Sequence, residues 1–346
     1  MSAAANAIHD YLDATSGARA AVAPGIHYGM SMAEYLAIPA LSAGVITTLL
    51  DRCPAAAWYG SPWNPRRASS SSAEQDAGSI AHSIFLEGSR DVCEVIDPND
   101  HPAEKTGNIP DGWTNKSIKA ARDAARAAGK IPVLKPAMAE IEAIAAAART
   151  YVDGLRESEP AIHALFEPAG GTSETVLIWR EGETLCKLRA DRLATDYALI
   201  ADYKSTGVSA EPNRFGRTQL INLRYYVSAS WYRRGVRAVT GVDPTYLFLA
   251  GETDAPYLHS LIGCDPSLAE LGDEKVGAGL AAWQECERAN HWPAYPNRVA
   301  WIEAPVYERA QWDERNGVDG DGIPYDLSKL FGPPKEHPFS HKKEVA

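Results

Sequence analysis

The segment SETVLIWREGETLCKLRADRLATDYALIADYKST, residues 173–206, has the pattern of three consecutive β-strands. Residues 175–179 and 185–189 are rich in β-branched and apolar side chains, and the turn-prone Glu-Gly-Glu between them predicts a hairpin. Residues 197–203 are almost continuously apolar, which is typical of a strand buried on both faces. The segment therefore predicts the centre of a sheet.

Charged residues interrupt this apolar pattern near the strand ends. Asp191 falls just beyond the second predicted strand, Asp202 lies near the end of the third, and Lys204 follows two residues later. Because residues i and i+2 of a strand point to the same face, we expect Asp202 and Lys204 to share one site. Carboxylates that hold Mg²⁺ beside a cation suit phosphodiester hydrolysis. The spacing matches the PD-(D/E)-x-K nuclease signature, and an ordinary ion pair at a solvated strand end is the alternative.

Length and composition are those of a globular protein, since 346 residues with 45% hydrophobic side chains can bury a full core. No apolar run reaches the ~18–20 residues that span a bilayer. Asp10 and Asp13 stand where a signal peptide has basic and apolar residues, so we expect a cytoplasmic protein. The five cysteines lie far apart without a C-x-x-C pair, which indicates neither a zinc site nor a disulfide framework.

The net charge of −11 contrasts with the basic character expected of a DNA-binding protein. Between residues 203 and 240, however, there are seven basic residues and a single acidic one, Glu211. This local excess adjoins the proposed site in sequence and predicts a basic path for DNA, whereas a solvated helix face is the alternative. The basic residues are Lys204, Arg214, Arg217, Arg224, Arg233, Arg234 and Arg237.

Helical patterns flank the predicted sheet in the sequence. Ser31 and Glu34 have the spacing of a capping box, which predicts a short helix after them. Ser42 precedes an apolar helix that Pro54 ends or restarts. Further helices are expected over about 74–87, 115–128, 136–155, 214–239 and 267–289, and further strands over 93–96, 244–250 and 257–262.

Three regions are expected along the chain. Residues 1–25 are alanine-rich and predict a flexible arm, residues 26–305 form the folded domain, and residues 306–346 form an irregular tail. Within the domain, a helical region is inserted over about 115–165. The Pro- and Ser-rich stretch 61–73 is typical of a linker.

Several short motifs follow one another along the chain. They are HYGMSMAEYLAIPALSAGVITTLLDRCPAAAWY, DAGSIAHSIFLEG, SETVLIW, LRADRLA, IADYKST, LRYYVSASWYRRGV, DPTYLFLA and WPAYP. In order and spacing they resemble the RecE-type exodeoxyribonuclease family (exonuclease VIII), of the phage and prophage type, over roughly residues 26–295. The resemblance implies an α/β fold with a PD-(D/E)-x-K, restriction-endonuclease-like core, in which helices flank a central mixed sheet, and an added helical region.

The resemblance also implies a metal site. Asp191 and Asp202 are the expected ligands of Mg²⁺, for which Mn²⁺ would substitute. His82 in the motif IAHSIF, Glu174 and the backbone carbonyl of Tyr203 are implied to complete the site. Without the resemblance, His82 would be interpreted as a structural histidine and Glu174 as a surface glutamate.

Other implied roles concern water and DNA. Lys204 is implied to position or activate the attacking water. Relatives carry a glutamine four residues before a tyrosine on the helix that follows the site, whereas this chain has Ser228 before Tyr232, which leaves the glutamine's contact open. The residues expected to contact DNA are Ser42, Arg52, Arg217, Arg224, Ser228 and Tyr232.

The function implied is that of a Mg²⁺-dependent exodeoxyribonuclease that degrades linear double-stranded DNA from 5′ to 3′, for recombination or repair by single-strand annealing. Implied partners are double-stranded DNA ends, a single-strand annealing protein and further copies of the chain in a ring. A single-strand nuclease or an endonuclease of the same fold is the first alternative. A non-catalytic DNA-binding module is the second, although Asp191, Asp202 and Lys204 together argue against it.

Overall fold

The computed structural model of this chain describes residues 22–64 and 73–316. The chain divides after residue 294 into two units, which are described separately. Most of the expected arm (1–25), linker (61–73) and tail (306–346) lies outside the described residues. The five cysteines are all free. Among the described residues, no helix is long and apolar enough to cross a membrane.

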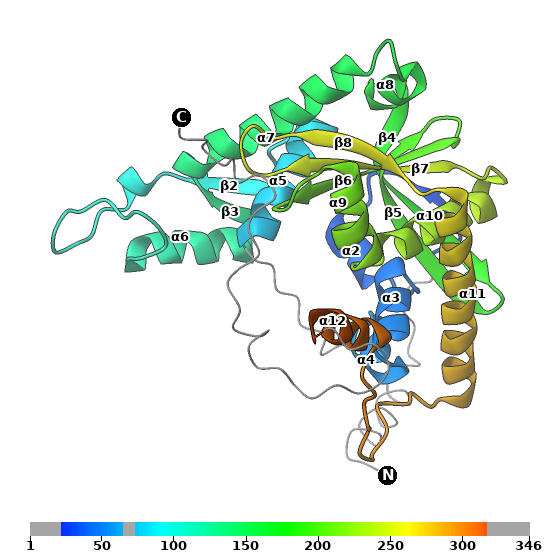
Figure 1. The fold of residues 1–346 in the computed structure, drawn as a ribbon. Coiled ribbons are helices and arrows are strands. Elements are labelled where there is room, and N and C mark those ends of the chain that lie inside the picture. The colour runs from blue at the N-terminus through cyan, green and yellow to red at the C-terminus, as the bar shows by residue number, and fades with distance from the viewer. Residues whose placement is uncertain (1–21, 65–72, 317–346) are drawn as a thin grey trace, which may run out of the picture. The chain divides into compact units, whose positions relative to one another are not determined.

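A six-stranded mixed sheet and a two-stranded sheet organise the first unit (Figure 1). The strands are β1 (Gly25–His27), β2 (Cys93–Ile96), β3 (Ile131–Leu134), β4 (Gly171–Glu181), β5 (Thr184–Ala194), β6 (Leu199–Thr206), β7 (Thr245–Glu252) and β8 (His259–Gly263). The large sheet has the order β1-β4-β5-β6-β7-β8, in which β6 and β7 are parallel and the other neighbouring pairs antiparallel. Strands β2 and β3 pair in parallel. The expected α/β fold with a central mixed sheet is therefore confirmed.

The hairpin and third strand predicted from residues 173–206 are the central strands β4, β5 and β6. The hairpin turns at Gly182, whose φ of 60° lies in the left-handed region that glycine adopts readily. The prediction that Asp191 falls beyond its strand is wrong. Strand β5 continues to Ala194 because Arg192 and Leu193 pair with β4 on one side and with β6 on the other.

Helices cover both faces of the large sheet (Figure 1). The helices of the first unit are α2 (Met32–Ala37), α3 (Ala43–Asp51), α4 (Pro54–Gly60), α5 (Ala73–Glu87), α6 (Lys116–Ala127), α7 (Lys135–Gly154), α8 (Pro160–Phe166), α9 (Pro212–Phe215), α10 (Tyr225–Thr240) and α11 (Pro266–Ala289), with a 3₁₀ turn at Pro98–Asp100. Of these, α6 packs on the small sheet of β2 and β3. Helices α3, α10 and α11 pack on one face around Trp231 and Trp283. Helices α5, α7 and α8 pack on the other, where Phe85 lies between Phe166 and Tyr203.

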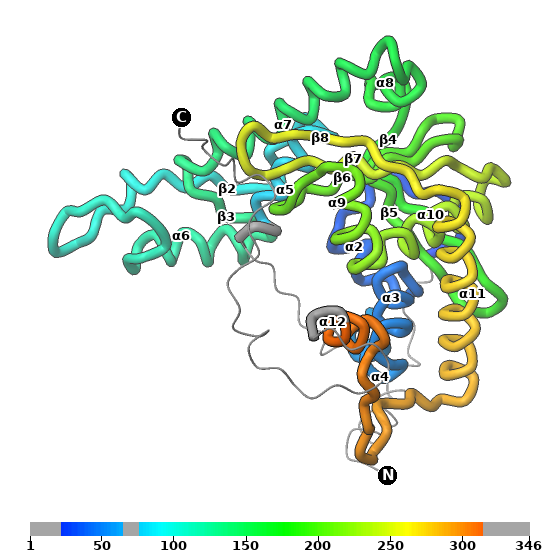
Figure 2. The backbone as a smooth tube through the Cα atoms, viewed as in Figure 1, coloured from blue at the N-terminus to red at the C-terminus, as the bar shows by residue number. Residues whose placement is uncertain are grey.

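The single helix predicted over 214–239 is wrong. After α9 the chain makes a π-helical turn, Gly216–Ile221, and α10 begins only at Tyr225 (Figure 2). Arg224 has φ 58° and ψ 31°, a left-handed conformation through which an α-helix cannot run. The predicted apolar stripe is interrupted at this break, since Leu220 is buried but Leu223 is half exposed.

Other elements were missed or differ from expectation. Strand β1 and the pairing of β2 with β3 depend on partners distant in sequence, which local patterns do not reveal. In the second unit, residues Val306–Asn316 form helix α12, so the expectation of an irregular tail is wrong for these residues. The sequence ERAQWDER consists mostly of good helix formers, and Glu308 in the first turn favours a helix N-terminus.

Candidate active site

The candidate site lies where two neighbouring strands separate. Strands β5 and β6 pair only at Arg192–Ala201 and Leu193–Ile200. Beyond these pairs the backbone N–H of Tyr203 donates to Asp191 Oδ2 at 3.0 Å, instead of to a carbonyl of β5. The carboxylate of Asp191 thus fills the gap between the diverging strands and satisfies a backbone donor there.

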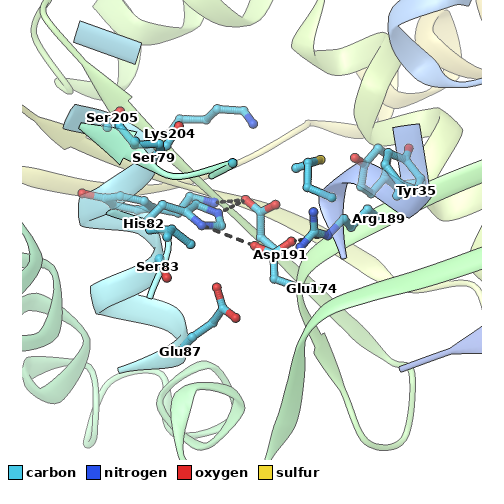
Figure 3. Close-up of a pocket in the computed structure, with 17 residues that line it drawn as sticks. Tyr35, Ser79, His82, Ser83, Glu87, Glu174, Arg189, Asp191, Lys204 and Ser205 are labelled. Atoms are coloured by element: carbon cyan, nitrogen blue, oxygen red, sulfur yellow. Dashed lines mark hydrogen bonds and ion pairs between the residues drawn. The ribbon is translucent and has the colours of Figure 1, made fainter. Parts of the chain in front are cut away.

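Helix α5 brings His82 over this gap. Gly78, one turn earlier, permits a close approach to β6, because a Cβ there would lie 2.6 Å from Ser205 Oγ. The ring of His82 then lies between two carboxylates, with Nε2 3.0 Å from Asp191 Oδ2 and Nδ1 3.4 Å from Glu174 Oε1 (Figure 3). The structure therefore joins His82 to the acids of the sheet, as the resemblance implies.

Glu174 has an unusual backbone for a residue within a strand. Its φ is 53°, although it lies inside β4 between Ser173, paired with Arg192, and Thr175, paired with Ala190. Glu174 therefore stands at the register position opposite Asp191. Non-glycine residues in this region cost about 1–2 kcal/mol, and such strain is concentrated at functional sites.

Arg189 belongs to the site but was not predicted. Its Nε lies 2.6 Å from Glu174 Oε2, and the side chain is largely buried. The sequence does contain a signal for Arg189, since Arg189 and Asp191 are two residues apart in β5 and therefore project from the same face. The same i, i+2 spacing that joins Asp202 to Lys204 on β6 thus places Arg189 beside Asp191.

Asp202 and Lys204 form a second part of the site, as predicted from their i, i+2 spacing. Lys204 Nζ lies 2.5 Å from Asp202 Oδ2, and Asp202 is only 4% exposed. The hydroxyl of Tyr246 also hydrogen-bonds to Asp202. The ammonium of Lys204 lies 5.4 Å from the ring centroid of Tyr225. Asp202 is therefore held in place by Lys204 and Tyr246.

These groups border a cavity of about 670 Å³. His82, Glu174, Asp191, Tyr203 and Lys204 line it, whereas Asp202 lies behind Lys204 and does not. Further lining residues that the sequence did not identify are Tyr35, Ser79, Ser83, Glu87, Arg189 and Ser205 (Figure 3). The cavity thus combines carboxylates, cations and hydroxyl groups.

Burial and neighbouring charges shift the pKa values of Glu174 and His82. Burial, followed by the charge of Asp191, raises the pKa of Glu174 from 4.5 to about 7. Burial alone would lower the pKa of His82, but Asp191 and Glu174 outweigh it and raise that pKa to about 9. Without a metal, His82 is therefore an imidazolium that holds the acids together.

Asp191, Asp202 and Lys204 also shift one another's pKa values. For Asp191, burial acts against ionisation, but His82 and Lys204 outweigh it and lower the pKa. Burial raises the pKa of Asp202 in spite of Lys204. Burial disfavours the ammonium of Lys204, yet Asp202 and Asp191 raise its pKa above the ordinary value. Lys204 is thus protonated at neutral pH.

The residues present fit a divalent cation. One ligand atom from each of His82, Glu174 and Asp191 lies within 4.8 Å of the other two, at the wall of the cavity. Two carboxylates and an imidazole are a donor set that divalent metals use. Asp202 is not in this group, and its Oδ2 is paired with Lys204. Its role as a ligand, like that of the Tyr203 carbonyl, stays a prediction.

The residues expected to contact DNA are dispersed. Ser42 precedes α3 and makes no side-chain capping bond, so the capping role that its position favours does not occur. Arg52 is exposed at the other end of α3. Arg217 is exposed on the π-helical turn, beside Arg214. On α10, Tyr232 lines the cavity, whereas Ser228, one turn earlier, is not among the lining residues.

The basic excess between residues 203 and 240 is largely neutralised by acids from other segments. The ion pairs are Arg224–Asp51, Arg233–Asp243, Arg234–Glu181 and Arg237–Asp243. Arg214 and Arg217 make no ion pair with a described residue. Lys204 is likewise paired with Asp202, so the predicted basic path is reduced to these two arginines.

The chain is similar to known proteins both in sequence and in fold. Residues 49–305 match the family described as "PDDEXK-like domain of unknown function". Among solved structures, a crystal structure from Eubacterium rectale named "Putative exonuclease" is similar to this chain, with a TM-score of 0.46 and 12% sequence identity, over 82% of this chain and 98% of the other. No curated protein matches. The family match spans His82, Glu174, Asp191, Asp202 and Lys204.

Proposed function

Because this chain belongs to the family of PDDEXK-like domains, and so to the PD-(D/E)-x-K nuclease superfamily, we propose that it is a Mg²⁺-dependent exodeoxyribonuclease. One observation carries the proposal. His82 from α5, Glu174 from β4, Asp191 from β5 and Lys204 from β6 converge on one cavity at the gap between β5 and β6. Ion pairs that only stabilise a fold do not need to face an open cavity, whereas the acids and the histidine of a catalytic site do.

His82, Glu174 and Asp191 would hold the metal, with Asp202 and the Tyr203 carbonyl as further candidate ligands. When bound, a divalent cation polarises the scissile phosphate and makes water a stronger nucleophile at neutral pH. The carboxylate of Asp191 is fixed for this role by the N–H of Tyr203. Arg189 holds the second oxygen of Glu174, so that the other oxygen points towards His82.

Lys204 acts in this proposal as a cation and hydrogen-bond donor. Its raised pKa favours the protonated ammonium, the form that donates hydrogen bonds, over the neutral amine that a general base requires. The ion pair with Asp202 holds Nζ at the cavity wall, where it is placed to orient water or to stabilise charge on a phosphate. Of the two roles implied for Lys204, positioning is therefore the one that its electrostatics favour.

The finer parts of the proposal rest on the resemblance to RecE-type exodeoxyribonucleases. They are action on ends of linear double-stranded DNA, 5′ to 3′ polarity, a ring-shaped homo-oligomer, a single-strand annealing partner and a cytoplasmic location in a bacterial or phage-infected cell. Exposed Arg214 and Arg217 are the first residues to test for contact with phosphate, because neither forms an ion pair with a described residue, although Glu211 lies beside them.

Digestion of end-labelled linear duplex, closed circular duplex and single-stranded DNA tests the function. With Mg²⁺, the proposal requires release of mononucleotides from the linear duplex and none from the closed circle, and EDTA must stop the release. Cutting of the closed circle would identify an endonuclease, and a preference for single strands would identify the other alternative. Binding without cleavage would leave a non-catalytic DNA-binding module.

Three variants connect the activity to the site. Asp191→Asn and Lys204→Ala are expected to lower the cleavage rate at least about 10²-fold, the effect of removing one group that stabilises developing charge. The exposed Glu183→Gln, on the hairpin turn of the same strands, is the matched control and should cleave as the wild type does. Full activity of folded Asp191→Asn would refute the assignment of the site.

A further inference from the structure

A second group of metal-ligating side chains lies where α7 meets α8, and it shares no residue with the lining of the cavity. It consists of Asp153 near the end of α7, His163 within α8 and Glu167 at the C-cap of α8. One ligand atom from each lies within 4.8 Å of the other two. The proposed nuclease activity assigns no role to these residues.

The histidine of this cluster is buried and incompletely satisfied. His163 is only 7% exposed, and its Nε2 has no hydrogen-bond partner among the described residues. The nearest carboxylate oxygen, Glu167 Oε1, is 3.5 Å from Nε2. A buried nitrogen without a partner is costly, so this imidazole has a ligand position that the protein itself does not fill.

The two carboxylates also lack a strong cationic partner. Asp153 makes no ion pair with a described residue, and Glu167 makes only the long contact to His163. The nearby arginines Arg149 and Arg192 are engaged with carbonyl groups at the C-terminal end of α8. Two acids beside an imidazole therefore leave negative charge that a cation would offset.

The backbone around the cluster is held in place. Arg192 donates to the carbonyl of Glu167 at 2.6 Å and to that of Leu165 at 2.8 Å. The turn between the helices is closed by hydrogen bonds from Glu159 N to Leu155 O and from His163 N to Glu159 O. Because Asp153 and Glu167 are exposed, their carboxylates can rotate to the donor separation of about 3.4 Å that a four-coordinate Zn²⁺ requires.

We propose that Asp153, His163 and Glu167 form a structural site for a divalent transition-metal cation, with Zn²⁺ as the fitting ion. An imidazole with two carboxylates is a donor set that Zn²⁺ takes in proteins. The ion would fasten the end of α7 to α8, and α8 is bound through Arg192 to β5, next to Asp191. The site thus stabilises the helices that cover the catalytic sheet and takes no part in cleavage.

Calorimetric titration of the metal-free full chain with Zn²⁺ tests the site, together with melting temperatures at each metal concentration. The titrations use an Asp191→Asn background, which weakens metal binding at the cavity. In this background Glu167→Gln and Asp153→Asn are each expected to reduce Zn²⁺ affinity at least about tenfold, since outer-shell partners alone are worth 10–100-fold. Both side chains are exposed, so the isosteric amides leave the fold intact.

The matched control is Glu157→Gln, an exposed glutamate in the same turn that is not part of the cluster. It should bind Zn²⁺ with the affinity of the Asp191→Asn protein, and Zn²⁺ should raise its melting temperature by the same amount. Equal Zn²⁺ affinity in Glu167→Gln, Asp153→Asn and Glu157→Gln would overturn the proposal. A second pair of results would also overturn it: a lower melting temperature of Glu167→Gln in EDTA, and no effect of Zn²⁺ on the melting temperature of the Asp191→Asn protein. These results would identify a simple ion pair between Glu167 and His163.

Discussion

Replacement of Lys187 by methionine should destabilise the first unit strongly. Lys187 lies in β5 and is only 2% exposed. Its ammonium donates to the carbonyl of Tyr35 at 2.7 Å and to that of Ile38 at 2.8 Å, and it lies 4.6 Å from the ring centroid of Tyr35. These carbonyls belong to the C-terminal end of α2, where the Tyr35 carbonyl also accepts from the N–H of Ile38 and the Ile38 carbonyl from the N–H of Ala40.

The magnitude follows from the bonds that are lost. Hydrogen bonds to a charged group are each worth about 1.5–3 kcal/mol, so the two bonds of Lys187 represent about 3–6 kcal/mol. Methionine keeps most of the stem's volume and removes the cost of burying a charge, which offsets part of the loss. We expect a net decrease of about 2–4 kcal/mol in the free energy of unfolding.

Urea unfolding measures this change. With a slope of about 3 kcal/mol per M, Lys187→Met should lower the midpoint by about 1 M. Lys119→Met, on the exposed side of α6, is the matched control and should unfold at the wild-type midpoint. A midpoint of Lys187→Met within about 0.2 M of the wild type would refute the reasoning, because the buried ammonium would then contribute nothing to stability.

Three further predictions concern the site and the second unit. Because the folded-state pKa values of Glu174 and His82 are raised to about 7 and about 9, their stabilising contribution is present at low pH and is lost as pH rises through those values. The melting temperature in EDTA should therefore fall between about pH 5 and 9, and Mg²⁺ should add more stability at high pH than at low pH. Ser228→Gln should retain or modestly raise the cleavage rate, measured on linear duplex. A lower melting temperature of Ser228→Gln, together with unchanged rate and stability of Ser228→Ala, would remove Ser228 from the site. Removal of residues after Pro305 should leave the melting temperature of the first unit nearly unchanged, since the chain divides into separate units before it, and a drop of many degrees would contradict this.

Local sequence patterns predicted the elements whose partners are near in the chain. The β4–β5 hairpin needs only its turn and two apolar runs, and β6 needs only its apolar run, so all three were found. The capping box of Ser31 and Glu34 is present as expected, with both reciprocal bonds. The i, i+2 rule likewise placed Asp202 and Lys204 in contact. Signals of this kind are complete within a few residues.

The parts that were missed depend on contacts between distant segments. The break before α10 coincides with the ion pair between Arg224 and Asp51 of α3, which no local pattern contains. Neutralisation of the basic excess has the same origin in part, because Asp51 and Glu181 come from distant segments, whereas Asp243 follows α10 closely. Residue counts along a window measure formal charge, whereas the field that DNA meets depends on these pairings.

The gap between β5 and β6 explains why the candidate site forms at this place. If β5 and β6 stayed paired along their whole length, the N–H of Tyr203 would donate to a carbonyl of β5. The carboxylate of Asp191 would then have no backbone N–H to bind. Because the strands separate, the carboxylate of Asp191 takes that donor, and the left-handed backbone of Glu174 lies opposite on β4. The paired residues on either side of Glu174 keep the hairpin intact and so offset the strain. An acid at each of these two positions concentrates negative charge at the cavity, where His82 and Arg189 balance it in the absence of a metal. A divalent cation that displaces the proton of His82 would therefore enter a site whose acids are already in place.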